Sequence, residues 1–170
     1  MFLTRRRIAL FGAIAALVIT IIFLPRIQYY VNAPDANAID IDLSDIKMAN
    51  VKGTNNIELT IFFNIHNPSD KTATTSKIEY DLFANDQFVG SNVLSYEDIP
   101  LNGRPQFTPG DNITLKSPFL VQISEKNAEI TDTLKSNSSD LLKTIKWHVN
   151  GTSQIESAFV TVVKKFSDDL

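Results

Sequence analysis

The chain of 170 residues contains no cysteine and only two histidines. The absence of cysteine excludes disulfides, thiolate zinc sites and cysteine nucleophiles, and two histidines leave little for histidine-based metal or acid–base chemistry. The patterns Gly-x-Ser-x-Gly and His-Glu-x-x-His and a glycine-rich phosphate loop are also absent. The sequence therefore predicts a protein that is not an enzyme, with no catalytic residue, no metal site and no cofactor.

The few candidate chemical groups are better explained as surface residues. His66 and His148 are distant in sequence, and each falls opposite the apolar row of its predicted strand. Asp40, Asp42 and Asp45 carry oxygen ligands suitable for Ca²⁺, but they lack the twelve-residue loop with a central Gly and a terminal Glu. We expect these three carboxylates on the solvated face of a strand.

Acidic residues are absent before Asp35, whereas Arg5, Arg6 and Arg7 make the amino end positive. Of the 16 Lys and Arg residues, 13 lie from Arg26 onward together with all 19 Asp and Glu residues, so this part carries a net charge of −6. Nucleic-acid binding normally requires a stripe of Lys and Arg that neutralises phosphates. The charge distribution therefore argues against a nucleic-acid partner.

One long apolar run lies near the amino end. Residues 8–24 contain no charge, and only Gly12 and Thr20 are not strongly apolar. A helix of this length spans roughly 25 Å, slightly less than the ~30 Å hydrocarbon core of a bilayer. Arg7 and Arg26 can snorkel to cover the difference. We therefore predict a transmembrane helix over residues 8–24, whose partner is the lipid bilayer.

The charges beside this helix predict its orientation. Positive residues are retained on the cytoplasmic side of a membrane, so residues 1–7 are predicted to be a cytoplasmic basic tail. Residues 25–37 are short and polar, contain Pro34 and lack periodicity, which predicts a linker. The predicted localisation is the cell membrane, with a single pass, a cytoplasmic amino terminus and an extracytoplasmic carboxy-terminal domain.

A cleaved signal peptide is the alternative, because charged residues precede the apolar run and the segment 36–38 has the small-x-small form of a cleavage site. The apolar run exceeds the usual signal core and Ala38 lies far beyond it, which favours an uncleaved anchor. The segment 4–8 also resembles a twin-arginine export signal, although Ala9 weakens the match.

Residues 38–170 are predicted to form one domain of mainly β structure. Apolar residues at 57, 59, 61, 63 and 65 alternate with more polar ones, as in a strand with one buried face. Asn85-Asp86 indicates a hairpin between two further strands. The other predicted strands cover 39–46, 78–82, 88–94, 113–115 with 119–123, 145–149 and 158–163. Seven or so short antiparallel strands predict a β-sandwich.

Residues 125–145 depart from the strand pattern. Apolar residues at 130, 134, 141, 142 and 145 have helical spacing, and Ser124 is placed to cap the start. Because a continuous helix would put Asn137 on the apolar stripe, we expect a break around 136–139. The predicted sandwich thus carries a short helical insertion.

Several short motifs occur in a recognisable order along this domain. They are Asn67-Pro68-Ser69, Tyr80, Phe88-Val89-Gly90, Ile99-Pro100 and Trp147-His148-Val149-Asn150-Gly151. Together they resemble the WHy domain (water stress and hypersensitive response) of the group 2 late embryogenesis abundant family, over roughly residues 39–166. The resemblance implies a fibronectin-like or immunoglobulin-like antiparallel β-sandwich with a helix near one end, no catalytic centre and an association with desiccation or water stress. Membrane-anchored members of that family are familiar.

The motif residues have structural explanations. Pro68 lacks an amide hydrogen and disfavours helical geometry at Asn67, so the pair is expected to end a strand, with the Asn side chain capping the turn. Trp147 shares a strand face with apolar neighbours and is expected in the core. Gly90 indicates a bulge or a close strand contact. Asn150 followed by Gly151 predicts a tight turn, since both residues accept positive φ.

Three sequons lie on the side predicted to be outside the cell. They begin at Asn112, Asn137 and Asn150, which makes these residues candidate glycosylation sites. A fourth match, Asn67-Pro68-Ser69, is not a sequon because its middle residue is proline. A mass shift lost after deglycosylation is the expected sign of occupancy.

The predicted function is a membrane-anchored, non-enzymatic domain that protects against desiccation on the outer face of the membrane. The first alternative is a cell-envelope adhesion or assembly module that binds another protein, not identified by the sequence, through a sheet face or edge; outward Phe62 is its one hint. A hydrolase or ligand carrier ranks last, and an apolar pocket with converging polar groups would favour it.

Overall fold

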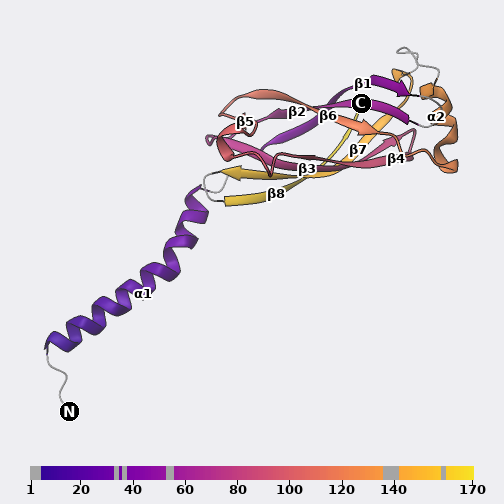
Figure 1. The fold of residues 1–170 in the computed structure, drawn as a ribbon. Helices are drawn as coiled ribbons and strands as arrows, with labels where there is room; N and C mark the ends of the chain where they lie inside the picture. Colours follow the sequence, from indigo (N-terminus) through magenta and orange to yellow (C-terminus); the bar gives the residue numbers. More distant parts are fainter. Residues whose placement is uncertain (1–4, 33–34, 36–37, 53–55, 136–141, 158–159) are drawn as a thin grey trace.

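The computed structural model describes residues 5–32, 35, 38–52, 56–135, 142–157 and 160–170. They form a long helix, α1, that projects from one end of a β-sandwich (Figure 1). The structure confirms the predicted fold class of a mainly β antiparallel sandwich with a short helical insertion, preceded by one apolar helix.

Helix α1 covers Arg5–Asn32 and contains Pro25. The sequence placed the end of the helix at position 24 and a linker over 25–37, whereas residues 25–32 are helical. Proline inside a helix removes one hydrogen bond and costs about 3 kcal/mol in water, but membrane helices tolerate it. Apolar Ile27 and Val31, four residues apart, continue the helical spacing beyond the proline. The run of apolar residues was therefore a poor guide to where the helix ends.

The sandwich consists of two antiparallel sheets. The first has the strand order β1-β2-β6, and the second has the order β4-β3-β7-β8 with β5 paired to β3. The strands of the first sheet are β1 (Asp40–Lys52), β2 (Asn56–His66) and β6 (Asn112–Leu120). Those of the second are β3 (Ala73–Ala84), β4 (Gln87–Ser95), β5 (Gln106–Phe107), β7 (Trp147–Ser157) and β8 (Val160–Asp169).

The core lies between the two sheets and follows the period-two pattern of the sequence. The alternating apolar residues of β2 are completely buried: Ile57, Leu59, Ile61, Phe63 and Ile65. Three rings meet at the centre, because Phe63 makes edge contacts with Tyr80 at 4.9 Å and with Phe166 at 5.8 Å between centroids. Such geometry suits the quadrupoles of the rings.

The helical insertion follows β6. A 3₁₀ turn, η2 (Glu125–Asn127), leads into α2 (Ala128–Lys135), and Ile130 and Leu134 are buried against the sandwich. The Asn127 side chain accepts a hydrogen bond from the Ser124 amide at 2.9 Å, which closes the start of the helix. The predicted break at 136–139 falls outside the described residues.

The tight turn predicted at Asn150-Gly151 is wrong, because both residues lie inside β7. Gly151 pairs with Tyr80 on one side and with Phe166 on the other. A Cβ atom on Gly151 would lie 2.5 Å from the Glu79 carbonyl oxygen and 2.5 Å from the Phe166 ring. The glycine therefore serves close packing inside a strand, and this tertiary demand overrides the local turn signal.

Candidate functional site

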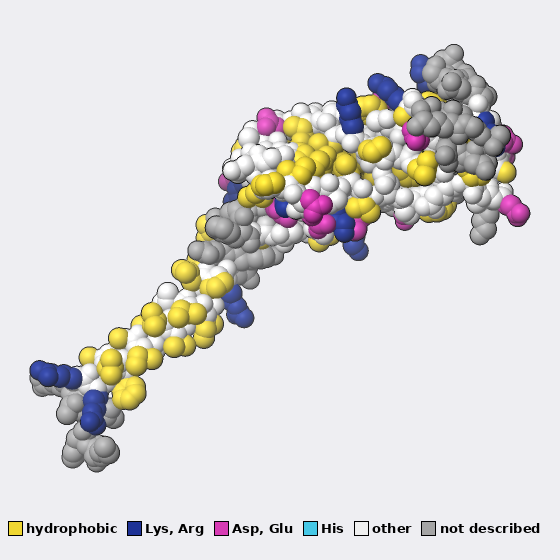
Figure 2. Space-filling view, viewed as in Figure 1, with side chains coloured by type: hydrophobic (Ala, Val, Ile, Leu, Met, Phe, Trp, Pro, Cys, Tyr) yellow, Lys and Arg dark blue, Asp and Glu magenta, His cyan; other side chains and the backbone are white. Residues whose placement is uncertain are grey.

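The side chains of residues 6–27 of helix α1 are exposed in the described structure. Its segment Arg6–Ile27 is 22 residues long and strongly apolar, and the most apolar stretch of this segment is not buried against the sandwich. Figure 2 shows apolar side chains along the helix, and cationic side chains both at its amino end, far from the sandwich, and near the sandwich. The helix is long and apolar enough to cross a membrane, a property that an amino-terminal signal sequence shares.

The helix is fastened to the sandwich at its carboxyl end. The Lys71 ammonium donates a hydrogen bond to the Val31 carbonyl oxygen at 2.6 Å, in the last turn of α1. Carbonyl groups in that turn lack partners within the helix and carry the negative end of its dipole. Lys71 therefore satisfies one of them and couples the helix to the loop after β2.

Asn67 is the most highly connected polar residue of the family motif. Its side chain is completely buried, and its amide donates to the Lys71 and Phe107 carbonyl oxygens at 2.8 and 3.0 Å. Its oxygen accepts from the Ser69 amide and hydroxyl at 3.1 and 2.6 Å. Every polar group of the side chain is occupied, which confirms the predicted structural role at the end of β2. Pro68 follows it on the surface.

The predictions for Gly90 and Trp147 are also confirmed. Gly90 adjoins a shift in the pairing of β3 with β4, and its φ is 156°. An added Cβ there would lie 3.0 Å from the Phe119 ring. Trp147 is 2% exposed, and its indole N–H donates to the Leu142 carbonyl oxygen at 3.1 Å. Both residues serve packing.

Two of the candidate sequons are accessible. Asn112 is exposed at the start of β6, and Asn150 is exposed in the middle of β7. Asn137 lies outside the described residues. Glycosylation at these positions stays a prediction.

The histidines and carboxylates belong to separate small clusters. His66 Nδ1 lies 3.2 Å from the Asp111 carbonyl oxygen, and His148 Nδ1 lies 2.6 Å from an Asp169 carboxylate oxygen. Partial desolvation of the exposed Asp42 carboxyl, with repulsion from Asp168 and Asp40, raises its pKa above the ordinary value. Within the described part of the chain, no group of three His, Asp or Glu side chains is placed to hold a metal ion.

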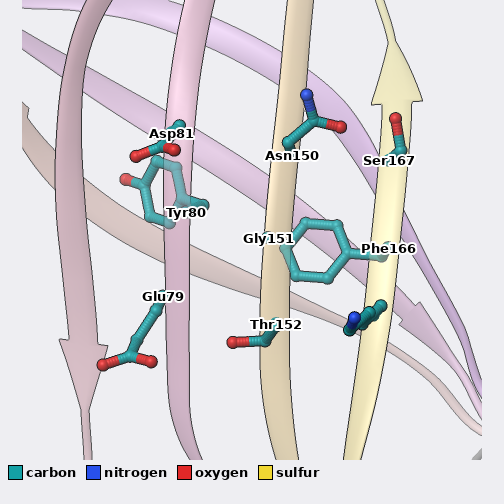
Figure 3. Close-up of a pocket in the computed structure, with 9 residues that line it drawn as sticks. Glu79, Tyr80, Asp81, Asn150, Gly151, Thr152, Phe166 and Ser167 are labelled. Atoms are coloured by element: carbon teal, nitrogen blue, oxygen red, sulfur yellow. The ribbon is translucent and has the colours of Figure 1, made fainter.

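A shallow hollow lies on the outer face of the second sheet, above Gly151 (Figure 3). Its volume is about 600 Å³, and the Phe166 ring extends from β8 toward Gly151 at its base. Tyr80, Gly151 and Phe166 are paired across β3, β7 and β8, and the Tyr80 and Phe166 side chains are buried, so this row forms the base of the hollow. Polar side chains from three strands surround it: Glu79, Asp81, Asn150, Thr152, Lys165 and Ser167. The hollow is open to solvent, and the Ser167 hydroxyl at its border lies 3.4 Å from His148 Nε2.

A second and more enclosed cavity, of about 630 Å³, lies beside β1. We call it the β1 groove. It lies between residues 45–48 of β1 and residues 142–147, which lead into β7, with Leu170 at its border. The lining residues are Asp45, Ile46, Lys47, Met48, Leu142, Lys143, Ile145, Trp147 and Leu170. No local sequence pattern indicates this groove, because its walls come from segments about 100 residues apart.

No family model matches the sequence, and no curated protein matches it. Among solved structures, the chain is similar to a protein from Archaeoglobus fulgidus, with 15% identity, coverage of 75% of this chain and 94% of that one, and a TM-score of 0.43. A protein from Arabidopsis thaliana has 12% identity and a TM-score of 0.47, and the match covers 75% of this chain and 79% of that one. A protein provisionally described as late embryogenesis abundant has 14% identity and a TM-score of 0.39, and the match covers 92% of this chain and 85% of that one. None of these similarities assigns the chain to a family.

Proposed function

We propose that the chain is a single-pass membrane protein whose β-sandwich stands on the outer face of the membrane as a non-enzymatic protective module under water stress. The observation that carries this proposal is the bare apolar surface of α1, which is joined to a sandwich that buries its own apolar residues. The stress role rests on the sequence resemblance to the WHy domain and on the acidic balance of the body.

The dimensions of α1 support a membrane anchor. Nineteen helical steps separate Arg7 from Arg26, which corresponds to roughly 28 Å at about 1.5 Å per step and is close to the ~30 Å hydrocarbon core. Val31 lies five steps further, or roughly 7 Å, at the depth of the headgroups. Lys71 is bound there, so the sandwich would stand directly on the outer surface.

The chemistry of the sandwich supports a role without catalysis. The buried Asn67 side chain is bonded within the fold, and so is Tyr80, whose hydroxyl donates to the Ser117 hydroxyl at 2.8 Å. The Thr74 hydroxyl and the Gln87 side-chain oxygen are buried without a partner, and neither is a strong nucleophile. His148 lies between Asp169 and Ser167: its Nδ1 is 2.6 Å from the Asp169 carboxylate, and its Nε2 is 3.4 Å from the Ser167 hydroxyl. This row lies on the solvent-exposed surface, where the Asp169 side chain is 84% exposed, whereas a catalytic triad needs a site that excludes water. His66 contacts the Asp111 carbonyl oxygen instead.

The mechanism that we propose is electrostatic. From Arg26 onward, 19 acidic residues outnumber 13 basic ones, a net charge of −6. Excess charge of one sign opposes association between surfaces and keeps the protein hydrated. A dense layer of such domains would hold neighbouring membranes apart as water is withdrawn.

A vesicle assay tests this role. Liposomes carrying the full chain are dried and rehydrated, and release of a trapped dye is measured. Wild type should reduce leakage relative to protein-free liposomes. A four-Asn variant changes the net charge of the body from −6 to −2 and should lose most of the protection. Its substitutions are at exposed positions: Asp70→Asn, Asp86→Asn, Asp98→Asn and Asp132→Asn.

The matched control changes charge in the opposite direction. Lys116→Gln together with Lys165→Gln brings the body to −8 and should retain protection. Equal protection by the four-Asn variant, or none by wild type, would contradict the proposed role.

The alternative of an assembly module has one structural feature to consider. Phe62 does face outward on β2, but the Lys47 and Lys116 ammonium groups lie over its ring at 4.9 and 5.8 Å from the centroid. These contacts are favourable by themselves. Phe62 therefore offers a partner less free apolar surface than the sequence suggested, and crosslinking in membranes would reveal a defined partner if assembly were the main role.

A further inference from the structure

The β1 groove has an apolar floor. The floor consists of four residues that are each less than 10% exposed, together with half-buried Met48. The four are Ile46, Leu142, Ile145 and Trp147. A cavity of about 630 Å³ falls within the range of roughly 300–1,000 Å³ that small-molecule sites occupy. The groove is therefore large enough for a ligand, and its floor suits an apolar one.

Water is a poor occupant of this floor. The indole N–H of Trp147 is the one strong side-chain hydrogen-bond donor among the five floor residues, and the Leu142 carbonyl oxygen already accepts its hydrogen bond at 3.1 Å. A buried water molecule needs two to four polar partners. The floor side chains supply none that are unused, so an apolar chain that displaced water there would gain free energy.

The charges at the mouth select the other end of the ligand. The Lys47 ammonium is paired with the Asp45 carboxylate at 3.1 Å and lies over the Phe62 ring. Lys143 is exposed and forms no ion pair with any residue that the structure describes. Asp45 neutralises Lys47, so Lys143 is the one lining side chain whose positive charge has no described acidic side chain beside it, and a ligand can meet this charge.

We infer that the β1 groove binds an amphiphile with a single apolar chain and a carboxylate head, the chemistry of a long-chain fatty acid. The chain would lie on the floor from Ile46 to Trp147, and the carboxylate would meet the Lys143 ammonium at the mouth. This inference does not depend on the protective role, because it concerns a groove beside β1 and involves neither the anchor nor the acidic residues changed in the vesicle assay.

The position of the single tryptophan makes the site directly measurable. Trp147 lies on the floor and is the only tryptophan in the chain. It begins β7, whereas Ser157 ends that strand and bonds to the Thr72 carbonyl oxygen, next to Lys71 at the helix junction. Ten strand steps correspond to roughly 33 Å. Bromine quenches tryptophan fluorescence only near contact, so brominated lipid within the bilayer would not reach Trp147.

The experiment uses the full chain in lipid nanodiscs and titrates 9,10-dibromostearate. Saturable quenching of Trp147 is expected, whereas the methyl ester of the same acid should quench much less, and brominated phosphatidylcholine built into the disc should not quench. The uncharged ester tests the carboxylate contact, and the brominated phospholipid tests whether the signal comes from the bilayer.

Two variants test the two halves of the site. Lys143→Glu, at an exposed position, should weaken the apparent affinity at least fivefold, and Met48→Glu should abolish saturable quenching because it places a carboxylate on the floor. Lys146→Gln is the matched control, since Lys146 is exposed in the same segment but does not line the groove. It should leave the titration unchanged.

The inference is overturned if dibromostearate produces no saturable quenching, or if the ester quenches equally. It is also overturned if Lys143→Glu has the same effect as Lys146→Gln. The thermal melt of Met48→Glu shows whether that variant is folded; should it unfold, the exposed Lys143→Glu variant decides the question alone.

Discussion

Helix α1 and strand β2 contain similar apolar residues and place them in opposite surroundings. Leu17 of the helix is 62% exposed, whereas Phe63 of the strand is completely buried. The helix is apolar on every face, and the strand is apolar at every second residue. A helix that is apolar all around needs a solvent other than water, while a strand with one apolar face needs a second sheet. The comparison teaches that periodicity, more than residue type, decides what covers an apolar side chain.

The largest effect is expected in the sandwich. Phe63→Ala removes the central ring that contacts Tyr80 and Phe166 and leaves a cavity, so the free energy of unfolding should fall by about 3–5 kcal/mol. Urea denaturation measures this loss. Retention of the protein in membranes after alkaline washing should be unchanged, and release of the variant would show that the two regions are not independent.

The converse change is Leu17→Arg in the middle of α1. A central Arg should make membrane insertion less favourable by about 2.5–3.5 kcal/mol. The fraction that resists alkaline extraction should fall, while the urea midpoint of the sandwich stays the same. Leu17→Val, which keeps the residue apolar, should behave as wild type; an equal loss with Val would reject the membrane explanation.

A smaller effect is expected for the polar centre of the motif. Asn67→Ala removes the side-chain hydrogen bonds to the Phe107 and Lys71 carbonyl oxygens and from the Ser69 amide, and should lower the free energy of unfolding by about 1–3 kcal/mol. Asn64→Ala is the control, because Asn64 lies on the outer face of the same strand; its effect should stay within about 0.5 kcal/mol. Equal effects would remove the special role of Asn67.

The smallest effects concern two carboxylates that respond to pH in opposite directions. Partial desolvation and the neighbouring Asp168 and Asp40 raise the pKa of Asp42, so the folded state binds this proton more tightly than the unfolded state does. Stability from this group falls as pH rises from the ordinary value of 3.8 through the folded pKa. Asp42→Asn should remove that decline.

The pKa of Asp111 is shifted in the opposite direction, downward. The Thr108 hydroxyl and amide donate to its carboxylate at 2.6 and 2.9 Å and lower its pKa. Its contribution is present above 3.8 and is lost as pH falls through the folded pKa. Urea midpoints between pH 2 and 7 should show that Asp111→Asn matters mainly at the upper end; the same pH profile for both variants would contradict the assignment.

The sequence predicted those features that depend on local pattern. The alternation in β2, the burial of Trp147 and the capping role of Asn67 follow from periodicity and turn chemistry, and the structure confirms them. Asn150-Gly151 was misjudged because the packing of the Phe166 ring is a long-range contact. Helix α1 extends to Asn32, beyond the predicted span, because a helix can continue after its uncharged apolar run ends.

The β1 groove could not be predicted for a related reason. Its floor joins Met48 of an edge strand to Ile145 and Trp147 of the other sheet, and each of these residues is by itself an ordinary core or strand residue. The volume between them depends on how the edges of the two sheets meet. No spacing within a single segment carries that information.

The most direct test of the central claim uses protease on intact cells that express the full chain with an epitope before Arg5. The account predicts that the protease removes the sandwich while the tagged amino-terminal fragment, still joined to α1, remains protected in the membrane. A sandwich that stays intact until the cells are broken, or a chain that alkaline washing releases whole, would contradict it.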